Sequence, residues 1–200
     1  MSLAGYKIFI DPGHGGSDPG AVNTAQGLQE KEIVLDIAKR LQTRLQALGA
    51  TTQLSRTGDT YPSLAARAQA SNTFKANIFI SVHVNAGGGT GVETWVHDNA
   101  SSNTIKLAGY VSKALASKLS ATLRSPTTDG VKKAPSQRPA GNIYVIDPKN
   151  TNAWAILPEI LFIDHATDIP KLKSSTQRQN AAEAIASGVS SFVATLPPIN

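Results

Sequence analysis

The feature of the sequence that most constrains its fold is a regular alternation between short apolar runs and longer segments with helical spacing. The run at residues 77–84, Asn-Ile-Phe-Ile-Ser-Val-His-Val, is mostly apolar, which is typical of a strand buried on both faces. Strands of this kind belong to sheets that are covered by helices on both sides. The alternation therefore predicts a single α/β domain with a central, mostly parallel sheet flanked by helices, and we expect it to span residues 1–200.

Individual elements follow from local patterns. Apolar residues recur at helical spacing between 34 and 48, Glu30 opens this helix, and Gly49 stands where its carboxyl-terminal cap would lie. Pro62 is placed to start a second helix, which we expect at 63–74. Two further helices are expected at 104–123 and 181–196, and loops at 11–27 and 125–141. The expected strands are 6–10, 51–54, 77–84, 92–96, 142–146 and 155–163.

Composition narrows the classes of function. The sequence contains no cysteine, so any metal must be held by His, Asp or Glu. Nineteen Lys and Arg against 14 Asp and Glu give a net charge of +5, which suits a polyanionic partner such as nucleic acid or a cell-wall polymer and equally suits a soluble basic domain. Basic residues are not interleaved with aromatic ones, which disfavours nucleic acid as a partner.

Targeting signals are also missing from the pattern. No apolar run approaches the ~18 residues that a membrane span needs. The first residues lack the charged, then apolar, then small-residue pattern of a signal peptide. We therefore expect no membrane span and no signal peptide in this sequence, so that either the signal was removed or the protein leaves the cell by another route.

Two histidines lie in settings that suit catalysis or metal binding. His14 is flanked by glycines in Asp-Pro-Gly-His-Gly-Gly, directly after the first expected strand, so its imidazole has little steric cover. His83 lies in the apolar run 77–84, where an imidazole is costly unless it is hydrogen-bonded or bound to a metal. Taken alone, a turn histidine near solvent and a satisfied core histidine explain these two residues at least as well.

Two glutamates complete the candidate set. Glu30 stands in the first turn of its helix, where an acid also simply stabilises the helix dipole. Glu159 lies within the apolar run 155–163, where a carboxylate should have a raised pKa or a charged partner unless it points outward. Because ligands gather at the carboxyl ends of parallel strands, these glutamates and the two histidines can share one edge of the sheet.

Together the four residues supply two imidazoles and two carboxylates. Two His and one Glu form a known ligand set for hydrolytic zinc, which leaves one coordination position for water. The spare carboxylate then acts as general base, since a metal lowers the pKa of bound water to about 7. His97 and His165 lack such a setting, and we interpret both as surface or loop residues.

A series of sequence blocks extends over nearly the whole chain in a fixed order and spacing: 7–16 (KIFIDPGHGG), 18–21 (DPGA), 27–31 (GLQEK), 54–57 (LSRT), 64–67 (LAAR), 80–85 (ISVHVN) and 91–94 (GVET). These blocks resemble the amidase-3 family of zinc amidases, which hydrolyse N-acetylmuramoyl-L-alanine bonds in bacterial peptidoglycan. The sequence is most similar to the sporulation and phage-lysin branch of that family.

The resemblance implies a single α/β domain and assigns roles residue by residue. His14, Glu30 and His83 match the zinc ligands of the family, and Glu159 matches its catalytic base on a late strand. The implied reaction is zinc-dependent hydrolysis of the amide bond between N-acetylmuramic acid and the L-alanine of the stem peptide. The general base takes a proton from water and passes it to the leaving nitrogen.

The segment around the proposed base departs from the family pattern. Leu161 stands where the family has glycine. If Pro158 sets the register instead, Asp164 falls near the position of the base, but Glu159 is preferred because residues 162–164 then fit without a gap. The stretch 125–152 also departs from the pattern, so no substrate contact is carried over to it.

The resemblance also implies the setting in which the chain works. We expect peptidoglycan as the partner, with anionic wall polymers as a further contact, and a monomer that acts outside the cell as an autolysin or an endolysin. Two alternatives stay open. A zinc peptidase that cuts within the stem peptide would share the ligands, whereas a non-catalytic wall-binding module would need neither the full ligand set nor Glu159.

Overall fold

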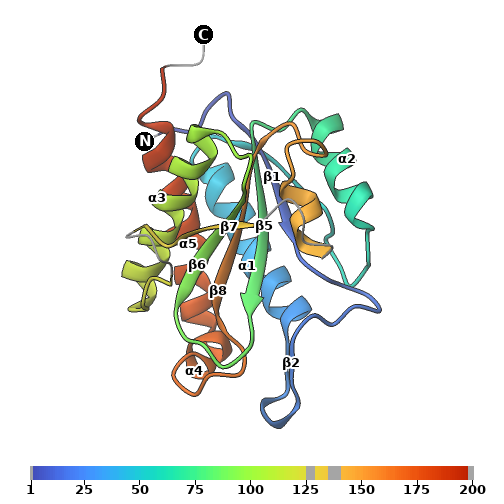
Figure 1. Ribbon diagram of the computed structural model, residues 1–200, viewed down its shortest axis with the longest axis vertical. Helices are drawn as coiled ribbons and strands as arrows, with labels where there is room; N and C mark the ends of the chain where they lie inside the picture. The colour runs from blue at the N-terminus through green and yellow to red at the C-terminus, as the bar shows by residue number, and fades with distance from the viewer. Residues whose placement is uncertain (1, 125–128, 135–140, 198–200) are drawn as a thin grey trace.

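The computed structural model describes residues 2–124, 129–134 and 141–197, and its centre is a six-stranded sheet (Figure 1). The strands are β1 (Lys7–Pro12), β4 (Thr51–Leu54), β5 (Ile78–Asn85), β6 (Val92–His97), β7 (Val131–Ala134) and β8 (Trp154–Phe162). Their order is β4-β1-β5-β8-β6-β7. The first four strands in this order are parallel, β6 is antiparallel to β8, and β7 is parallel to β6. The expected α/β domain with a mostly parallel sheet is therefore confirmed.

Helices cover both faces of this sheet. The helices α1 (Glu30–Ala47), α3 (Ser102–Leu119) and α5 (Ser175–Val193) lie on one face, and α2 (Leu64–Phe74) and the 3-10 helix η2 (Gly141–Ile146) lie on the other (Figure 1). Smaller elements lie near the carboxyl ends of β5 and β8: α4 (Ile169–Lys173), and a hairpin of β2 (Val22–Asn23) and β3 (Leu28–Gln29) joined by the 3-10 helix η1 (Thr24–Gln26). None of the helices in the described ranges is long and apolar enough to cross a membrane.

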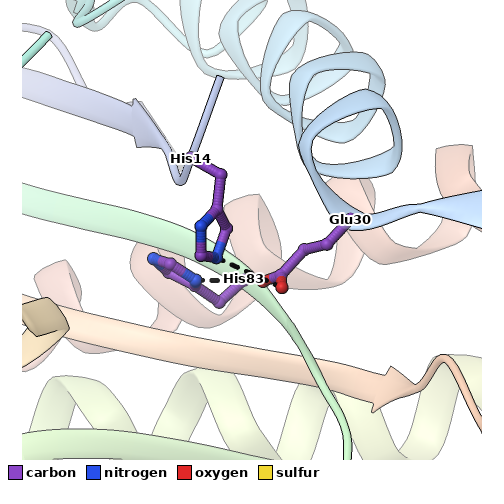
Figure 2. Close-up of side chains that lie close together, drawn as sticks. All are labelled: His14, Glu30 and His83. Atoms are coloured by element: carbon purple, nitrogen blue, oxygen red, sulfur yellow. Dashed lines mark hydrogen bonds and ion pairs between the residues drawn. The ribbon is translucent and has the colours of Figure 1, made fainter. Parts of the chain in front are cut away.

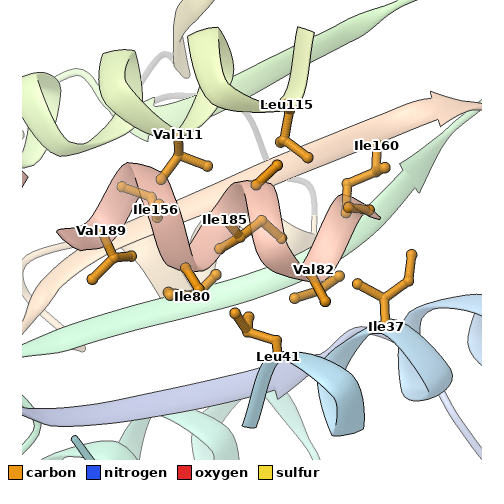
Figure 3. Packing of buried hydrophobic residues seen from close by; sticks show 14 of the residues in the cluster. Ile37, Leu41, Ile80, Val82, Val111, Leu115, Ile156, Ile160, Ile185 and Val189 are labelled. Carbon is orange, nitrogen blue, oxygen red and sulfur yellow. The ribbon is translucent and has the colours of Figure 1, made fainter. Parts of the chain in front are cut away.

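The larger apolar core lies between the sheet and the three-helix layer. Within each helix the buried apolar residues recur every three or four positions, so that one stripe of the helix faces the sheet. Figure 3 shows these stripes meeting the central strands: Ile37 and Leu41 of α1, Val111 and Leu115 of α3, and Ile185 and Val189 of α5 pack with Ile80 and Val82 of β5 and Ile156 and Ile160 of β8.

The opposite face carries a smaller apolar cluster. Phe9 and Phe79 stack there with ring centroids 5.7 Å apart, and Val145 and Ile146 of η2 belong to the same cluster. Side chains on one face of a strand recur every second residue. The residues on this face that follow the cluster toward the carboxyl ends of their strands are therefore Asp11, Ser81, His83 and Glu159. The polar groups thus lie on the less covered face, beyond the apolar cluster.

Most expected strands and helices are present within a few residues of their predicted bounds, and three predictions were wrong. The predicted loop at 11–27 contains β2 and η1. Residues 142–146 form part of the 3-10 helix η2 instead of a strand, because Val145 and Ile146 cover the smaller cluster and do not pair in the sheet. The predicted loop at 125–141 contains β7, which pairs with β6. Its segments 125–128 and 135–140 lie outside the described residues.

Two helices differ from their predicted lengths, and the reason lies in their caps. The helix α3 ends at Leu119, since Ser120 adopts a left-handed conformation with φ of 47°. The helix α5 begins six residues before its predicted start, at Ser175, where the Ser174 hydroxyl accepts a hydrogen bond from the Gln177 amide. The short helix α4 was not predicted.

Candidate metal centre

Three residues that are far apart in the sequence converge at the carboxyl edge of the parallel strands (Figure 2). His14 follows β1, Glu30 begins α1, and His83 lies on β5. His14 Nε2 is 3.1 Å from Glu30 Oε2, and His83 Nδ1 is 3.0 Å from Glu30 Oε1. One possible ligand atom from each residue lies within 4.8 Å of the others. Two imidazole nitrogens and a carboxylate oxygen around one point are a donor set that fits zinc.

The backbone around His14 is shaped for this close approach. His14 itself has a φ of 58°, a left-handed conformation that is strained for a residue with a side chain. A Cβ atom at Gly13 would collide with the His83 ring. A Cβ atom at Gly20 would lie 2.6 Å from Glu30 Oε2 and 2.7 Å from His14 Cδ2. The glycines of the 11–27 loop therefore let the loop pass directly against the ligand side chains.

Two buried arginines bind the same loop through hydrogen bonds to its backbone carbonyls. Arg67 of α2 forms an ion pair of 2.7 Å with Asp11 and donates to the His14 carbonyl at 2.7 Å. Arg56 donates to the carbonyls of Pro12 at 3.0 Å and Gly13 at 2.7 Å. No role was expected for either arginine from the sequence, although both lie in blocks that carry the resemblance. They fix the unusual backbone on which the His14 imidazole depends.

Hydrogen bonds also orient the ligand side chains themselves. The Glu30 carboxylate accepts from the backbone amides of Ala21 and Val84, both at 2.9 Å. His14 Nδ1 lies 2.8 Å from Asp18 Oδ2, which leaves Nε2 as the nitrogen that faces Glu30. Such partners behind a ligand are typical of metal sites, because they fix the ring orientation. Asp18 is a functional candidate that the sequence analysis did not single out.

The electrostatics of the cluster favour charged groups. Burial alone would raise the pKa of Glu30, but hydrogen bonds and charge from His14 and His83 outweigh it and lower that pKa. Burial alone would lower the pKa of His14, but the carboxylates of Glu30 and Asp18 outweigh it and raise that pKa. Glu30 is therefore an anion that attracts positive charge, whether from protons on the imidazoles or from a cation in their place.

Glu159 lies beside this group on the neighbouring strand. Its position on β8 is directly opposite His83 of β5 and, on the other side, Glu93 of β6. Its Oε2 atom is buried and has no hydrogen-bond partner among the described residues. Burial raises the pKa of Glu159 well above the usual glutamate value, and the charges of Glu30 and Glu93 raise it further, while Lys132 acts in the opposite direction. The raised pKa expected from the sequence is thus present.

The departure from the family pattern after Glu159 has a structural counterpart. Leu161 adopts a φ of 65°, a left-handed conformation that favours glycine, at the position where the family has glycine. The pairing of β5 with β8 shifts there by one residue, as in a β-bulge. The rival residue Asp164 is exposed and accepts hydrogen bonds from the amides of Gly87 and Gly88, at 2.7 and 2.9 Å.

One interpretation of the histidines was wrong. His97, expected at the surface or in a loop, is the last residue of β6 and is buried. Because β6 runs antiparallel to β8, His97 lies at the opposite end of the sheet from His83. His165 does lie in a loop and is partly exposed. Neither belongs to the cluster of ligand-type residues.

Comparisons with known proteins extend over almost the same residues. The sequence profile of a family described as N-acetylmuramoyl-L-alanine amidase matches residues 8–191. A sporulation-specific N-acetylmuramoyl-L-alanine amidase of Bacillus subtilis is 40% identical over 92% of this chain and 66% of its own length. The N-acetylmuramoyl-L-alanine amidase LytC of the same organism is 39% identical over 95% of this chain but only 36% of its own length. The chain therefore spans no more than about two thirds of these two relatives.

A solved structure agrees with these matches. The crystal structure of an N-acetylmuramoyl-L-alanine amidase from Clostridium difficile 630 superposes with a TM-score of 0.84 at 32% identity, covering 98% of this chain and 100% of that chain. The similarity thus includes the whole sheet and the edge at which His14, Glu30 and His83 meet.

Proposed function

Because this chain belongs to the N-acetylmuramoyl-L-alanine amidase family, we propose that it is a zinc-dependent amidase that cuts the bond between N-acetylmuramic acid and L-alanine in peptidoglycan. The observation that carries the proposal is the convergence of His14, Glu30 and His83 beside Glu159, whose Oε2 atom is buried. We further propose that residues 1–200 act as one catalytic domain, in the cell wall outside the cell.

The three converging residues would hold the ion. A zinc ion bound there would polarise the scissile carbonyl and lower the pKa of a water molecule at its open position. Glu30 supplies the anionic ligand, held in place by the amides of Ala21 and Val84. His14 supplies Nε2, because Asp18 occupies its other ring nitrogen.

Glu159 is the general base in this proposal. Residues directly opposite each other on paired strands have Cβ atoms about 5 Å apart, so the Glu159 carboxyl is within reach of the substrate at the ligand cluster. Its carboxylate takes a proton from the attacking water and delivers it to the alanine nitrogen as the amide bond breaks. The raised pKa suits the first half of this task, because it makes the carboxylate a stronger base toward the proton of the attacking water.

Identification of the new amine in digested peptidoglycan tests the proposal. An amidase releases peptides with a free L-alanine amino group, which amino-group labelling and mass spectrometry detect. A new amine inside the stem peptide would instead identify a peptidase with the same ligand set. Absence of any new amine, with zinc bound, would favour a wall-binding module.

The +5 net charge further supports an accessory contact with anionic wall polymers.

A further inference from the structure

A second charged cluster lies next to the proposed base, centred on Glu93 of β6. The Glu93 side chain is only 3% exposed. Its Oε2 lies 2.6 Å from Lys132 Nζ and 3.3 Å from Arg124 Nε, and its Oε1 accepts from Asn85 and Trp95 at 3.0 and 3.1 Å. This buried carboxylate is therefore fully satisfied by its neighbours, unlike Oε2 of Glu159.

The cluster holds two cations for one paired carboxylate. The side chains of Arg124 and Lys132 are 36% and 25% exposed, so both charged groups remain within reach of a ligand in solvent. Asp168, another buried carboxylate near the start of β6, accepts hydrogen bonds from the amides of Gly91 and Phe162 and forms no ion pair among the described residues. Taken by themselves, Arg124, Lys132 and Glu93 therefore have a net charge of +1 that attracts an anion, and the neighbouring Glu159 carboxyl offsets part of this charge when it is ionised.

Aromatic rings hold the two cations in place. The Arg124 guanidinium lies 4.6 Å from the centroid of the Phe162 ring, and Lys132 Nζ lies 5.2 Å from that of Trp95. Cations stacked on rings in this way lose less freedom when they bind an anion, because their positions are already restricted. The arrangement is therefore more ordered than two lysines or arginines on an open surface.

The position of the cluster defines which part of a substrate could reach it. His83, Glu159 and Glu93 lie in one row across β5, β8 and β6. Neighbouring strands are about 4.8 Å apart, so Glu93, which both cations contact, lies roughly 10 Å along the row from His83. An extended chain advances by about 3.5 Å per residue, so roughly 10 Å is about three residue lengths. With the lactyl acyl unit at the ligand cluster counted as the first length, this span ends at the second residue of the leaving peptide.

We propose that Arg124 and Lys132 form a subsite for a carboxylate of the leaving stem peptide, on the side of Glu159 away from the metal ligands. The inference rests on the proposed amidase activity and deepens it. The lactyl carboxyl of N-acetylmuramic acid forms the scissile amide, so the sugar carries no charge there. An anion near the scissile bond must therefore belong to the peptide. The matching group is the free α-carboxylate of the D-glutamate that follows L-alanine. This subsite sets the direction of the substrate, with the peptide running over β8 toward β6 and β7.

Two substrates that differ in one charge test the subsite. The first is N-acetylmuramoyl-L-alanyl-γ-D-glutamyl-L-lysine amide, and the second is the same compound with the α-carboxyl of D-glutamate converted to an amide. We expect the unaltered protein to cleave the acid with a kcat/KM about tenfold higher than the amide, mostly through KM, because a charge-assisted hydrogen bond is lost in the amide. Lys132→Gln and Arg124→Gln should each reduce this preference to less than about threefold.

Matched variants separate the subsite from a general effect on folding. Lys132→Arg keeps the charge and should keep the preference. Lys133→Gln changes the next residue on β7, which is exposed and lies on the opposite face of the strand, and should also keep it. If Lys132→Gln does not fold, as judged by thermal unfolding, Arg124→Gln still tests the subsite, because the Arg124 side chain is the more exposed of the two.

The outcomes distinguish this inference from the amidase proposal. Equal kcat/KM for the two compounds in the unaltered protein, with cleavage at the alanine nitrogen, would overturn the subsite and leave the amidase intact. A full preference for the acid in both folded Gln variants would also overturn it. No cleavage of either compound at that bond would contradict the amidase activity and remove the subsite with it.

Discussion

Both ends of the central sheet hold a buried histidine, and the difference between the two ends shows what makes a metal site. His83 and His97 are each 2% exposed, and each lies toward the end of its strand. Residue type, burial and position within a strand are therefore the same. The difference lies in direction, since β5 belongs to the parallel set and β6 is antiparallel to its neighbour β8. Strand direction alone places one histidine at the edge where β1 and α1 meet and the other at the far end.

The neighbours of the two rings follow from this placement. His83 faces a carboxylate that is shared with a second imidazole, so the donor atoms converge on one point. The His97 ring lies 3.0 Å from an oxygen of Asp98 and 3.7 Å from one of Asp147, and its Nδ1 accepts a hydrogen bond from the Asn99 amide. We therefore interpret His97 as a structural residue, and the two ends give matched pairs of variants.

The largest expected effect separates the two histidines directly. His83→Ala should weaken zinc binding by at least about a thousandfold and abolish turnover, because one of three ligands is lost. His97→Ala should keep stoichiometric zinc and most of the activity, while its free energy of unfolding falls by about 1–3 kcal/mol from the hydrogen bonds it loses. Elemental analysis after dialysis, a chelator competition and thermal unfolding measure these effects. Stoichiometric zinc in His83→Ala would remove His83 from the ligand set.

The next effect separates binding from chemistry at the metal end of the sheet. Glu159→Gln keeps the shape of the side chain but cannot take a proton, so turnover should fall by ~10²–10⁴-fold while zinc binding persists. Asp164→Asn is the control from the rival register and should keep most activity, because Asp164 is exposed and bonds to the turn at Gly87 and Gly88. The crossed result, an active Glu159→Gln and an inactive Asp164→Asn, would move the base to Asp164.

The sequence predicted one end of the sheet better than the other, and the reason is physical. The strand pattern of 77–84 and the glycines around His14 report local conformation, and parallel strands then bring their carboxyl ends together. The short run 92–96 mixes apolar and polar residues and does not reveal whether its strand is parallel or antiparallel, so the placement of His97 could not be predicted. The apolar residues 142–146 likewise fit a strand or a covering turn, and only packing against Phe79 decides between them.

Long-range polar contacts were also beyond the sequence. Arg67 is 53 residues from the carbonyl of His14 that it holds. Local propensity carries no information about such a pair. The blocks that contain Arg56 and Arg67 belong to the resemblance, but the resemblance does not predict which groups the two arginines contact. Leu161 is the reverse case, since its departure from glycine was visible in the sequence and its left-handed backbone appears only in the structure.

A smaller effect concerns two carboxylates that lie beside histidine rings, Asp18 beside His14 and Asp147 beside His97. Asp18→Asn should weaken zinc binding by about 10–100-fold, because partners of this kind fix the orientation of a ligand ring and raise its basicity. Asp147→Asn makes the same change near His97 and should leave zinc affinity unaltered. Competition with a chelator of known affinity measures both. Equal weakening in the two variants would indicate that the far end of the sheet is coupled to the metal site.

The smallest expected effect is a change in zinc affinity of about tenfold per pH unit, caused by competition between a proton and zinc at His14. Its raised pKa means that the metal-free protein gains stability from the protonated ring below the ordinary imidazole pKa, and loses that gain as pH rises through the raised value. Zinc needs the neutral ring, so zinc affinity should rise with pH up to the raised pKa and level off above it. Glu30 does not contribute to this change of zinc affinity with pH, because its pKa is lowered and it stays ionised throughout.

Calorimetry in buffers of different protonation enthalpy should show about one proton released per zinc at slightly acid pH and fewer above the raised pKa. The His97→Ala variant should give the same curve, because its ring lies at the other end of the sheet. A zinc affinity that does not change with pH in the unaltered protein would mean that the ion binds without displacing a proton from His14. A changed curve in His97→Ala would instead show that the two ends of the sheet titrate together.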